Sequence, residues 1–158
     1  MAKVIMTCGN LCSGKSTYAE KLGKELRAVV LSIDELMTTV LGRELGDMHD
    51  EYVRRCEQYL YKKAAETALA GTDVIIDWGF WKKAQRGYAR EFFRQQGIDC
   101  EFHYIAVSNE EWERRIAARN AEVLNGRSDV YHIDSGLLEK FRTMFEEPDR
   151  QEMDMWIE

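Results

Sequence analysis

The chain has 158 residues, 45% of them hydrophobic, and a formal net charge of −6 at pH 7. This length and hydrophobic content predict a single folded domain over residues 1–158, while the acidic balance argues against a protein that coats nucleic acid through a basic surface. The sequence contains no apolar run of transmembrane length, and its four cysteines show neither a C-x-x-C pair nor the clustering typical of metal ligands.

The first predicted unit is a strand, a glycine-rich loop and a helix. Residues 4–8 are an apolar run that predicts a buried strand, and the helix is expected over residues 15–27. Between them lies the complete motif G-x-x-x-x-G-K-[ST], in the strand–loop–helix context in which this motif binds phosphates. The loop consists of Gly9, Asn10, Leu11, Cys12, Ser13, Gly14, Lys15, Ser16 and Thr17.

Each residue type in this loop has a physical reason to be there. Gly9 and Gly14 allow backbone angles and close approaches that a Cβ would prevent. The loop N–H groups and the N-terminus of the following helix attract anions. Lys15 can reach the β- and γ-phosphates and the Ser16 hydroxyl can ligate Mg²⁺, so the motif predicts binding of ATP with Mg²⁺.

Asp34 follows a second apolar run, residues 29–33, which predicts the next strand of a parallel sheet. The residue therefore lies at the sheet edge where ligands bind in open α/β folds. Two interpretations are compatible with this position. Asp34 is a general base that takes a proton from a substrate hydroxyl, or it caps a helix over residues 35–41, and one role does not exclude the other.

Asp77 ends a third predicted strand, residues 73–77, after a long helix over residues 51–70. The basic residues of that helix are expected on a solvated face, with binding of an anionic substrate by one or two arginines as the alternative. An apolar run closed by aspartate downstream of a glycine loop is the Walker-B-like pattern. Such a carboxylate holds Mg²⁺, directly or through water, or orients a neighbouring cation, and the alternative is again a helix cap.

Aromatic residues follow Asp77 immediately. Trp78, Phe80 and Trp81 are candidates for the walls of a substrate pocket, and the alternative is that they belong to the hydrophobic core. Arg86 lies in the next predicted helix, residues 82–96. It either reaches back to the phosphates or the substrate, or it lies on the surface.

Arginines gather on the helix that follows a fourth predicted strand, residues 101–107. Arg115 and Arg119 are four residues apart and share one helix face. The polar segment beyond them, which includes Arg127, predicts a lid over about residues 119–134. Closure of such a lid would let these arginines stabilise charge on the γ-phosphate. The alternative is a ladder of surface charges with neighbouring glutamates.

The last predicted elements are a helix over residues 135–145 and a short edge strand over residues 153–157. Pro148, the only proline, lies between them, so no proline-rich hinge divides the chain. Because the first strand begins within four residues of Met1, no signal peptide is expected, and a cytoplasmic protein with reduced thiols is the simplest expectation.

These features resemble the small P-loop kinases related to the 5′-kinase domain of polynucleotide kinase. That group also includes chloramphenicol phosphotransferase, zeta toxins and many bacterial members without an assigned activity. The resemblance rests on the glycine loop, Asp34, Asp77, R-x-x-x-R-N at residues 115–120 and F-E-x-P at residues 145–148. It implies a P-loop NTPase fold with a five-stranded parallel sheet of order 2-3-1-4-5, flanked by helices and carrying an arginine-bearing lid. It also implies that Asp34 is the general base and that a lid arginine contacts the ATP phosphates.

Met37 departs from the pattern of the polynucleotide kinases. Those enzymes usually carry an arginine three residues after the base, where it grips the phosphate of the acceptor. Met37 occupies that position here, and an apolar side chain cannot replace a bidentate guanidinium. The substitution favours a small-molecule acceptor over nucleic acid.

The leading functional hypothesis is an ATP-dependent phosphotransferase acting on a small-molecule hydroxyl, with Asp34, Lys15 and Arg119 as its catalytic residues. One alternative is a polynucleotide or RNA 5′-hydroxyl kinase. Another is a regulatory NTPase without an acceptor, although the sequence has no N-K-x-D motif for reading guanine. No membrane partner is expected, and neither the acceptor nor the oligomeric state is indicated by the sequence.

Overall fold

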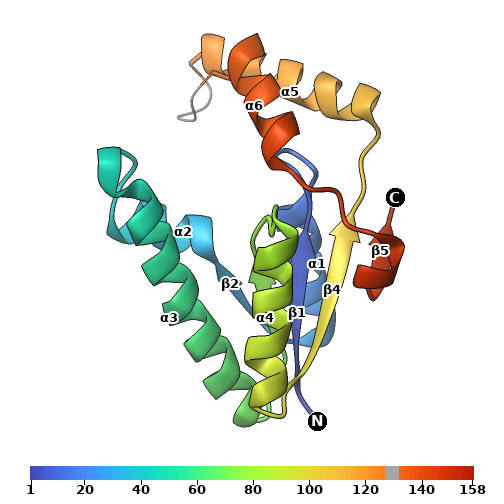
Figure 1. The fold of residues 1–158 in the computed structure, drawn as a ribbon. Coiled ribbons are helices and arrows are strands. Elements are labelled where there is room, and N and C mark those ends of the chain that lie inside the picture. The colour runs from blue at the N-terminus through green and yellow to red at the C-terminus, as the bar shows by residue number, and fades with distance from the viewer. Residues whose placement is uncertain (127–131) are drawn as a thin grey trace.

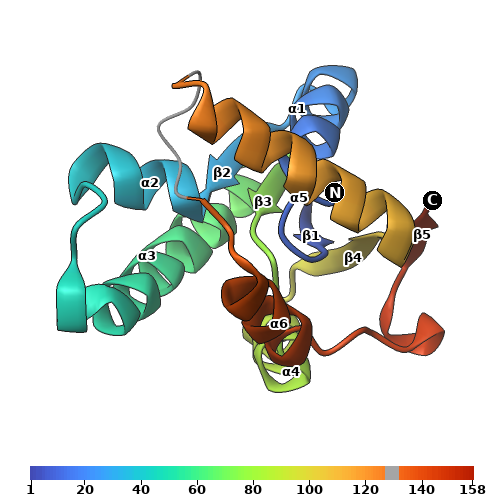
Figure 2. The same ribbon diagram turned by 90° about the horizontal axis from the view of Figure 1, so that it is seen from above.

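Five parallel strands form the centre of the protein (Figures 1 and 2). The structure is a computed structural model, and it describes residues 1–126 and 132–158. The strands are β1 (Lys3–Cys8), β2 (Val29–Ser32), β3 (Val74–Asp77), β4 (Asp99–Ile105) and β5 (Met155–Ile157). They lie in the order β2-β3-β1-β4-β5 and their pairings are parallel. The predicted sheet order of 2-3-1-4-5 is therefore confirmed.

The inner strands are apolar on both faces because helices cover both sides of the sheet. Val4 and Met6 of β1 belong to one apolar cluster and Ile5 to another, and all three are fully buried. Parallel strands joined by helical crossovers need this pattern, since neither face of the sheet meets water. The uninterrupted apolar run at the start of the chain is thus a direct consequence of the fold.

Helices form a layer on each side of the sheet. Those of the described residues are α1 (Lys15–Leu26), α2 (Ile33–Val40), α3 (His49–Leu69), α4 (Lys83–Gln95), α5 (Asn109–Leu124) and α6 (Ser135–Met144), with short 3-10 helices at Gly46–Met48 and Arg150–Glu152. Ala19 of α1 packs on one face, and Ala64 of α3 and Phe93 of α4 pack on the other. Figure 2 shows α1 on one side of the strands and α3 and α4 on the opposite side.

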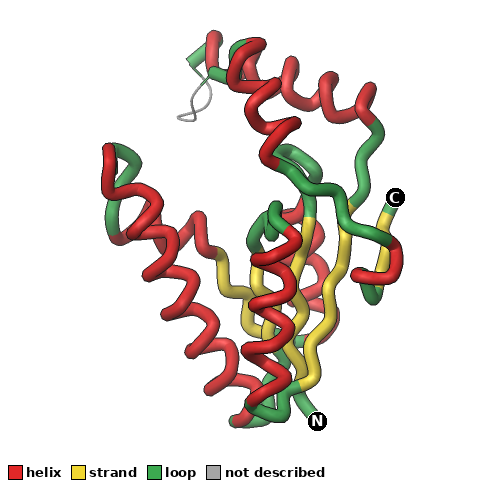
Figure 3. The backbone as a smooth tube through the Cα atoms, viewed as in Figure 1, coloured by secondary structure: helices red, strands yellow, loops and turns green. Residues whose placement is uncertain are grey.

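Helices α5 and α6 lie beyond the carboxyl ends of the strands (Figures 1 and 3). They are joined by a separate apolar cluster that contains Trp112, Ile116, Ile133 and Phe141. Leu11 of the glycine-rich loop packs against this same cluster. The cluster therefore connects α5 and α6 to the loop that follows β1.

Two helix boundaries differ from the prediction in ways that matter for the site. α2 begins at Ile33 because the Ser32 hydroxyl accepts a hydrogen bond from the backbone N–H of Glu35 and caps the helix. α5 continues as a regular helix to Leu124, so the first part of the predicted lid over residues 119–134 is helical. Residues 127–131, in the middle of that predicted lid, lie outside the described residues.

Candidate nucleotide and phosphoryl-transfer site

The glycine-rich loop turns from β1 into α1 through two residues with left-handed backbone angles. Gly14, the N-cap of α1, has φ 93° and Cys12 has φ 57°. Glycine adopts this conformation freely, whereas a side chain such as that of Cys12 disfavours it. Gly9 is needed for a different reason, since a Cβ there would lie 2.6 Å from Ser13 Oγ. Of the other loop residues, Ser13 is buried, Asn10, Leu11, Cys12 and Lys15 are half-buried, and Ser16 and Thr17 are exposed.

Lys15 folds back over the loop. Its Nζ donates to the Asn10 carbonyl at 2.6 Å and lies 3.4 Å from Ser13 Oγ. Burial lowers the pKa of the Lys15 ammonium, and the Asp77 and Asp34 carboxylates act in the opposite direction. Lys15 therefore lies between the loop and two carboxylates, and it can exchange the Asn10 carbonyl for a phosphate oxygen.

Ser16 and Asp77 meet at the start of α1. Ser16 Oγ donates a hydrogen bond to Asp77 Oδ2 at 2.7 Å, which joins the end of β3 to the phosphate-binding motif. A hydroxyl and a carboxylate suit Mg²⁺, which usually takes only one or two protein oxygens and fills its octahedron with phosphates and water. Within residues 1–126 and 132–158, no group of three or more His, Cys, Asp or Glu residues could hold a metal. The two residues thus fit the metal that accompanies a bound nucleoside triphosphate.

Asp34 lies in the first turn of α2, and its side chain is exposed. Ser32 is the N-cap of this helix, so the interpretation of Asp34 as the cap is wrong. Partial loss of hydration raises the pKa of the Asp34 carboxyl, and the nearby negative charge of Asp77 raises it further. Lys15 is the largest opposing influence. Asp34, Asp77 and Lys15 therefore form one electrostatic group, as expected for residues at the same edge of a parallel sheet.

Two arginines of α5 reach the glycine-rich loop. Arg115 donates from Nη1 to the Cys12 carbonyl at 3.3 Å, and its Nε contacts Glu111 Oε1 at 2.8 Å. Arg119 Nη1 lies 3.6 Å from Cys12 Sγ, and its positive charge lowers the pKa of the Asp34 carboxyl. Arg127 lies outside the described residues. Arg115 thus pairs with Glu111, as the ladder of surface charges predicts, and it also contacts the loop. Closure of a lid stays a prediction.

The tryptophans that follow β3 take different positions. Trp78 is half-buried and its Nε1 donates to Glu57 Oε1 of α3 at 2.8 Å. Trp81 is also half-buried, but its Nε1 donates to the Gly9 carbonyl at 3.1 Å. Trp81 therefore supports the phosphate-binding loop, which the sequence prediction did not anticipate.

Three predicted site residues are internal instead, and their assignment is corrected. The Phe80 ring is 1% exposed and packs between Tyr61 and Phe102, so it is part of the core and not a pocket wall. Met37 is 6% exposed in the same core because it lies on the buried face of α2. Arg86 is 2% exposed, which excludes the surface position, and its guanidinium is engaged away from the glycine-rich loop.

Arg86 of α4 instead forms an ion pair with Glu152, near the C-terminus. Its Nε pairs with Glu152 Oε1 at 3.1 Å, and its Nη1 donates to the carbonyls of Phe80 at 2.9 Å and Glu146 at 3.0 Å. A guanidinium has five N–H donors, so burial requires this many partners. The partner Glu152 comes from far along the chain, which is why local spacing did not reveal it.

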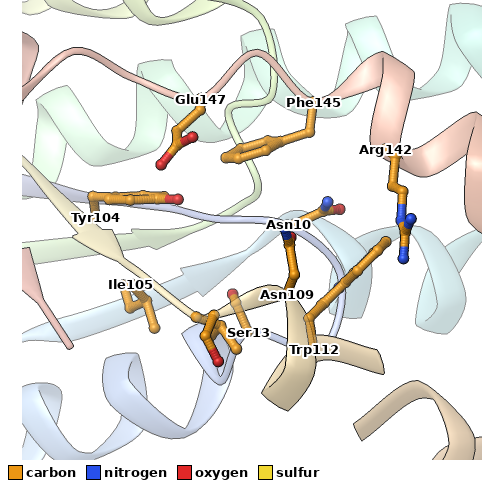
Figure 4. A pocket seen from close by; sticks show the side chains of 11 residues that line it. Asn10, Ser13, Tyr104, Ile105, Asn109, Trp112, Arg142, Phe145 and Glu147 are labelled. Carbon is orange, nitrogen blue, oxygen red and sulfur yellow. The ribbon is translucent and has the colours of Figure 1, made fainter. Parts of the chain in front are cut away.

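A cavity of about 470 Å³ lies beside the glycine-rich loop (Figure 4). Asn10 and Ser13 line it from the loop, and Tyr104, Trp112 and Phe145 line it from β4, α5 and the end of α6. Trp112 is 4% exposed, and its Nε1 donates to the Leu11 carbonyl at 2.6 Å. Trp112 is not among the site residues predicted from the sequence, because nothing in the local pattern indicates its bond to the loop.

The sheet order, the loop and the carboxylates at the strand ends define the P-loop fold that small kinases share. A sequence model of the AAA domain family matches residues 4–148, so the chain belongs to that family. None of the curated proteins is similar enough in sequence to match. No helix within the described ranges combines the length and apolar composition that crossing a membrane requires.

Solved structures of kinases and of an RNA repair complex share the fold. The APS kinase CysC of Mycobacterium tuberculosis, in complex with AMPPNP and APS, has 22% identity and a TM-score of 0.71, over 99% of this chain and 87% of that one. A gluconokinase from Sinorhizobium meliloti has 16% identity and a TM-score of 0.61, over 98% and 80%. A chain of the Pnkp1/Rnl/Hen1 RNA repair complex has 21% identity and a TM-score of 0.72, over 90% and 43%. At these identities the likeness concerns the fold.

Proposed function

We propose that the protein is an ATP-dependent phosphotransferase that moves the γ-phosphate to a hydroxyl group of a small molecule. The observation that carries the proposal is the grouping of Asp34 with Lys15 and Asp77 beside the glycine-rich loop. Asp77 is engaged by Ser16 and Asp34 does not cap its helix, so the Asp34 carboxylate remains available for a substrate. The fold shared with APS kinase and gluconokinase supports a small acceptor.

The residues divide the work of phosphoryl transfer. The loop N–H groups and Lys15 would bind the β- and γ-phosphates. Ser16 and Asp77 would hold Mg²⁺, which would supply positive charge to offset that of the phosphates. Asp34 accepts the proton of the acceptor hydroxyl as its oxygen bonds to the γ-phosphorus. The bond from the γ-phosphorus to the bridging oxygen breaks, and ADP leaves with that oxygen. Arg115 and Arg119 stabilise the negative charge on the transferred group, with Arg127 as a further candidate. Residues 1–158 act as one kinase domain.

The test is a phosphorylation screen in which purified protein, ATP and Mg²⁺ are combined with a library of hydroxyl-bearing metabolites. With an acceptor in hand, Asp34→Asn is expected to reduce kcat by about 10²- to 10⁴-fold, the usual contribution of a general base, while the Kd for ATP stays unchanged. Glu35→Gln is the matched control, because Glu35 is the next acidic residue of α2 and is exposed. Full transfer activity in Asp34→Asn would contradict the assignment of Asp34 as the general base.

A 5′-hydroxyl RNA or DNA end is the competing acceptor, because the RNA repair complex contains a chain of the same fold. The net charge of −6 argues against it. A 5′-hydroxyl oligonucleotide with labelled ATP distinguishes the two acceptors. Transfer to the oligonucleotide at low and moderate salt, with none to small alcohols, would replace the small-molecule proposal. ATP hydrolysis without any acceptor would instead favour a regulatory NTPase.

A further inference from the structure

Four consecutive backbone carbonyls of the phosphate-binding loop each accept a hydrogen bond from a side chain. The pairs are Trp81 Nε1 to Gly9 at 3.1 Å, Lys15 Nζ to Asn10 at 2.6 Å, Trp112 Nε1 to Leu11 at 2.6 Å and Arg115 Nη1 to Cys12 at 3.3 Å. The donors come from the β3–α4 connection, α1 and α5. They are of two kinds, since Lys15 and Arg115 are cations and the two indoles are neutral.

The direction of a carbonyl also decides the direction of the next N–H group. A trans peptide is planar, and its C=O and N–H bonds point to opposite sides. The bond from Trp81 to the Gly9 carbonyl therefore turns the N–H of Asn10 away from the indole, and the bond from Trp112 does the same for the N–H of Cys12. An anion-binding loop requires N–H groups that turn inward together.

We propose that Trp81 and Trp112 are positioning residues that hold the phosphate-binding loop in its anion-binding shape before the nucleotide arrives. The inference rests on the proposed function only in taking a triphosphate as the ligand of the loop. In that function Lys15 and Arg115 leave their carbonyls to bind phosphate oxygens. The indole N–H is an uncharged donor. The two tryptophans therefore keep their hydrogen bonds to the loop carbonyls when the two cations turn to the phosphates.

Packing fixes both indoles in place. Trp112 is 4% exposed in the cluster shared by α5 and α6, and the Arg142 guanidinium lies 5.4 Å from the centre of its ring. The Trp81 ring meets the Phe141 ring edge-on, with 5.5 Å between their centres. Leu11 of the loop packs against the same cluster. The loop is thus attached to α5 and α6 through side-chain packing as well as through hydrogen bonds.

Gly79 explains how Trp81 can approach so closely. A Cβ on Gly79 would lie 2.4 Å from Trp81 Nε1, so any side chain there would displace the indole. The Gly79 carbonyl also accepts a hydrogen bond from the N–H of Gly9 at 3.1 Å. Gly9 is therefore held on its N–H side by Gly79 and on its carbonyl side by Trp81. Phe80, which lies between these two residues, is buried in the core and anchors the connection.

The left-handed backbone of Cys12 needs support from neighbouring residues. Its φ of 57° is disfavoured for a residue with a side chain, and its own carbonyl accepts from Arg115, a cation that leaves it for a phosphate in the proposed function. The Leu11 carbonyl belongs to the peptide that leads into Cys12, and Trp112 fixes that peptide. The Trp112 bond therefore maintains the Cys12 conformation when Arg115 turns to a phosphate.

Replacement by phenylalanine tests the proposal, because the ring remains and the N–H is lost. Binding of ATP with Mg²⁺, and of inorganic tripolyphosphate, is measured by calorimetry for Trp81→Phe, Trp112→Phe and Trp156→Phe. Each of the first two is expected to weaken binding of both ligands about tenfold, the effect of one lost hydrogen bond. Trp156→Phe is the matched control, because Trp156 lies in β5 and packs on Tyr104 of β4. This variant is expected to bind both ligands like the wild type.

Gly79→Ala provides a second variant that leaves both tryptophans intact. It is expected to weaken binding like Trp81→Phe, and the double variant should be no weaker than Trp81→Phe alone, since both act on one bond. If Trp81→Phe and Trp112→Phe bound both ligands with wild-type affinity and showed only a lower unfolding midpoint, the indoles would serve packing alone. That result would overturn the proposal. Failure to find an acceptor would instead concern the proposed function, because this test measures binding alone.

Discussion

Asp77 ends β3, and Asp34 lies in the first turn of α2, just after the neighbouring strand β2. Their partners give the two carboxylates different chemistry. Asp77 is 8% exposed and accepts a hydrogen bond from Ser16, which commits it to the phosphate and metal side of the site. Asp34 is exposed on the next element, and its helix is capped by Ser32 instead. A buried, engaged carboxylate is suited to hold a cation, and an exposed one with a raised pKa is suited to accept a proton.

The pH dependence of catalysis should report this difference. A general base works only when deprotonated, so a raised Asp34 pKa places the acid limb of the kcat/KM profile above the ordinary aspartate value. The charge of His49 lowers the Asp34 pKa. We therefore expect His49→Gln to move the acid limb to higher pH.

The measurement is the pH–rate profile of the wild type and His49→Gln with the acceptor found by screening. Lys62→Gln is the control, because Lys62 is an exposed cation farther along the same helix, α3. An acid limb that moves to lower pH in His49→Gln, or that moves equally in the control, would contradict the assignment of this limb to Asp34.

At the scale of elements, the connection from β3 to α4 joins the site to the core. Trp78 is bonded to α3, Phe80 is a core residue and Trp81 is bonded to the loop, so adjacent aromatic residues contact different parts of the fold. Arg86 then holds both this connection, at the Phe80 carbonyl, and the C-terminal segment, at Glu152. The position of the loop support thus depends on a buried ion pair outside the site.

Breaking this ion pair should destabilise the protein. Arg86→Gln is expected to lower the free energy of unfolding by about 2 kcal/mol, because the carbonyls of Phe80 and Glu146 lose their donor and the half-buried Glu152 loses its ionic partner. Urea denaturation measures the change, and Arg94→Gln is the control. Arg94 pairs with Glu91 on the exposed face of α4, where water screens the charges, so its loss should have a much smaller effect. An equal decrease in the free energy of unfolding for the two variants would show that the Arg86–Glu152 pair stabilises the protein no more than an exposed pair does.

For the molecule as a whole, the sequence predicted what depends on local pattern. The loop motif, the positions of Asp34 and Asp77 and the alternation of strands and helices indicated a parallel sheet and the edge that carries the site. The resemblance to small P-loop kinases implied the sheet order. The directions of Phe80, Arg86 and Trp81 were not predictable, because they depend on partners from distant segments such as Phe102, Glu152 and Gly9. Those partners meet only once the sheet and helices have packed.

Burial in the core also links the stability of the whole molecule to alkaline pH. Cys8 is fully buried at the end of β1, and burial raises the pKa of its thiol to about 12. A raised pKa means that the folded state holds the proton more tightly than the unfolded state. The stabilisation is complete below the unfolded value of 9.0 and is lost as pH rises toward 12. The free energy of unfolding should therefore fall by about 1.4 kcal/mol per pH unit from this one group.

Cys8→Ala removes the titrating thiol and should flatten this dependence. The free energy of unfolding is measured by denaturant titration at several pH values from about 8 to about 10.5, and the slopes are compared, since the substitution also changes packing. Cys56→Ala is the control, because the Cys56 thiol lies half-buried on α3 and its contribution to the slope should be smaller. A Cys8→Ala slope equal to that of the wild type would mean that the thiolate forms without unfolding, and that the end of β1 beside the phosphate-binding loop admits water.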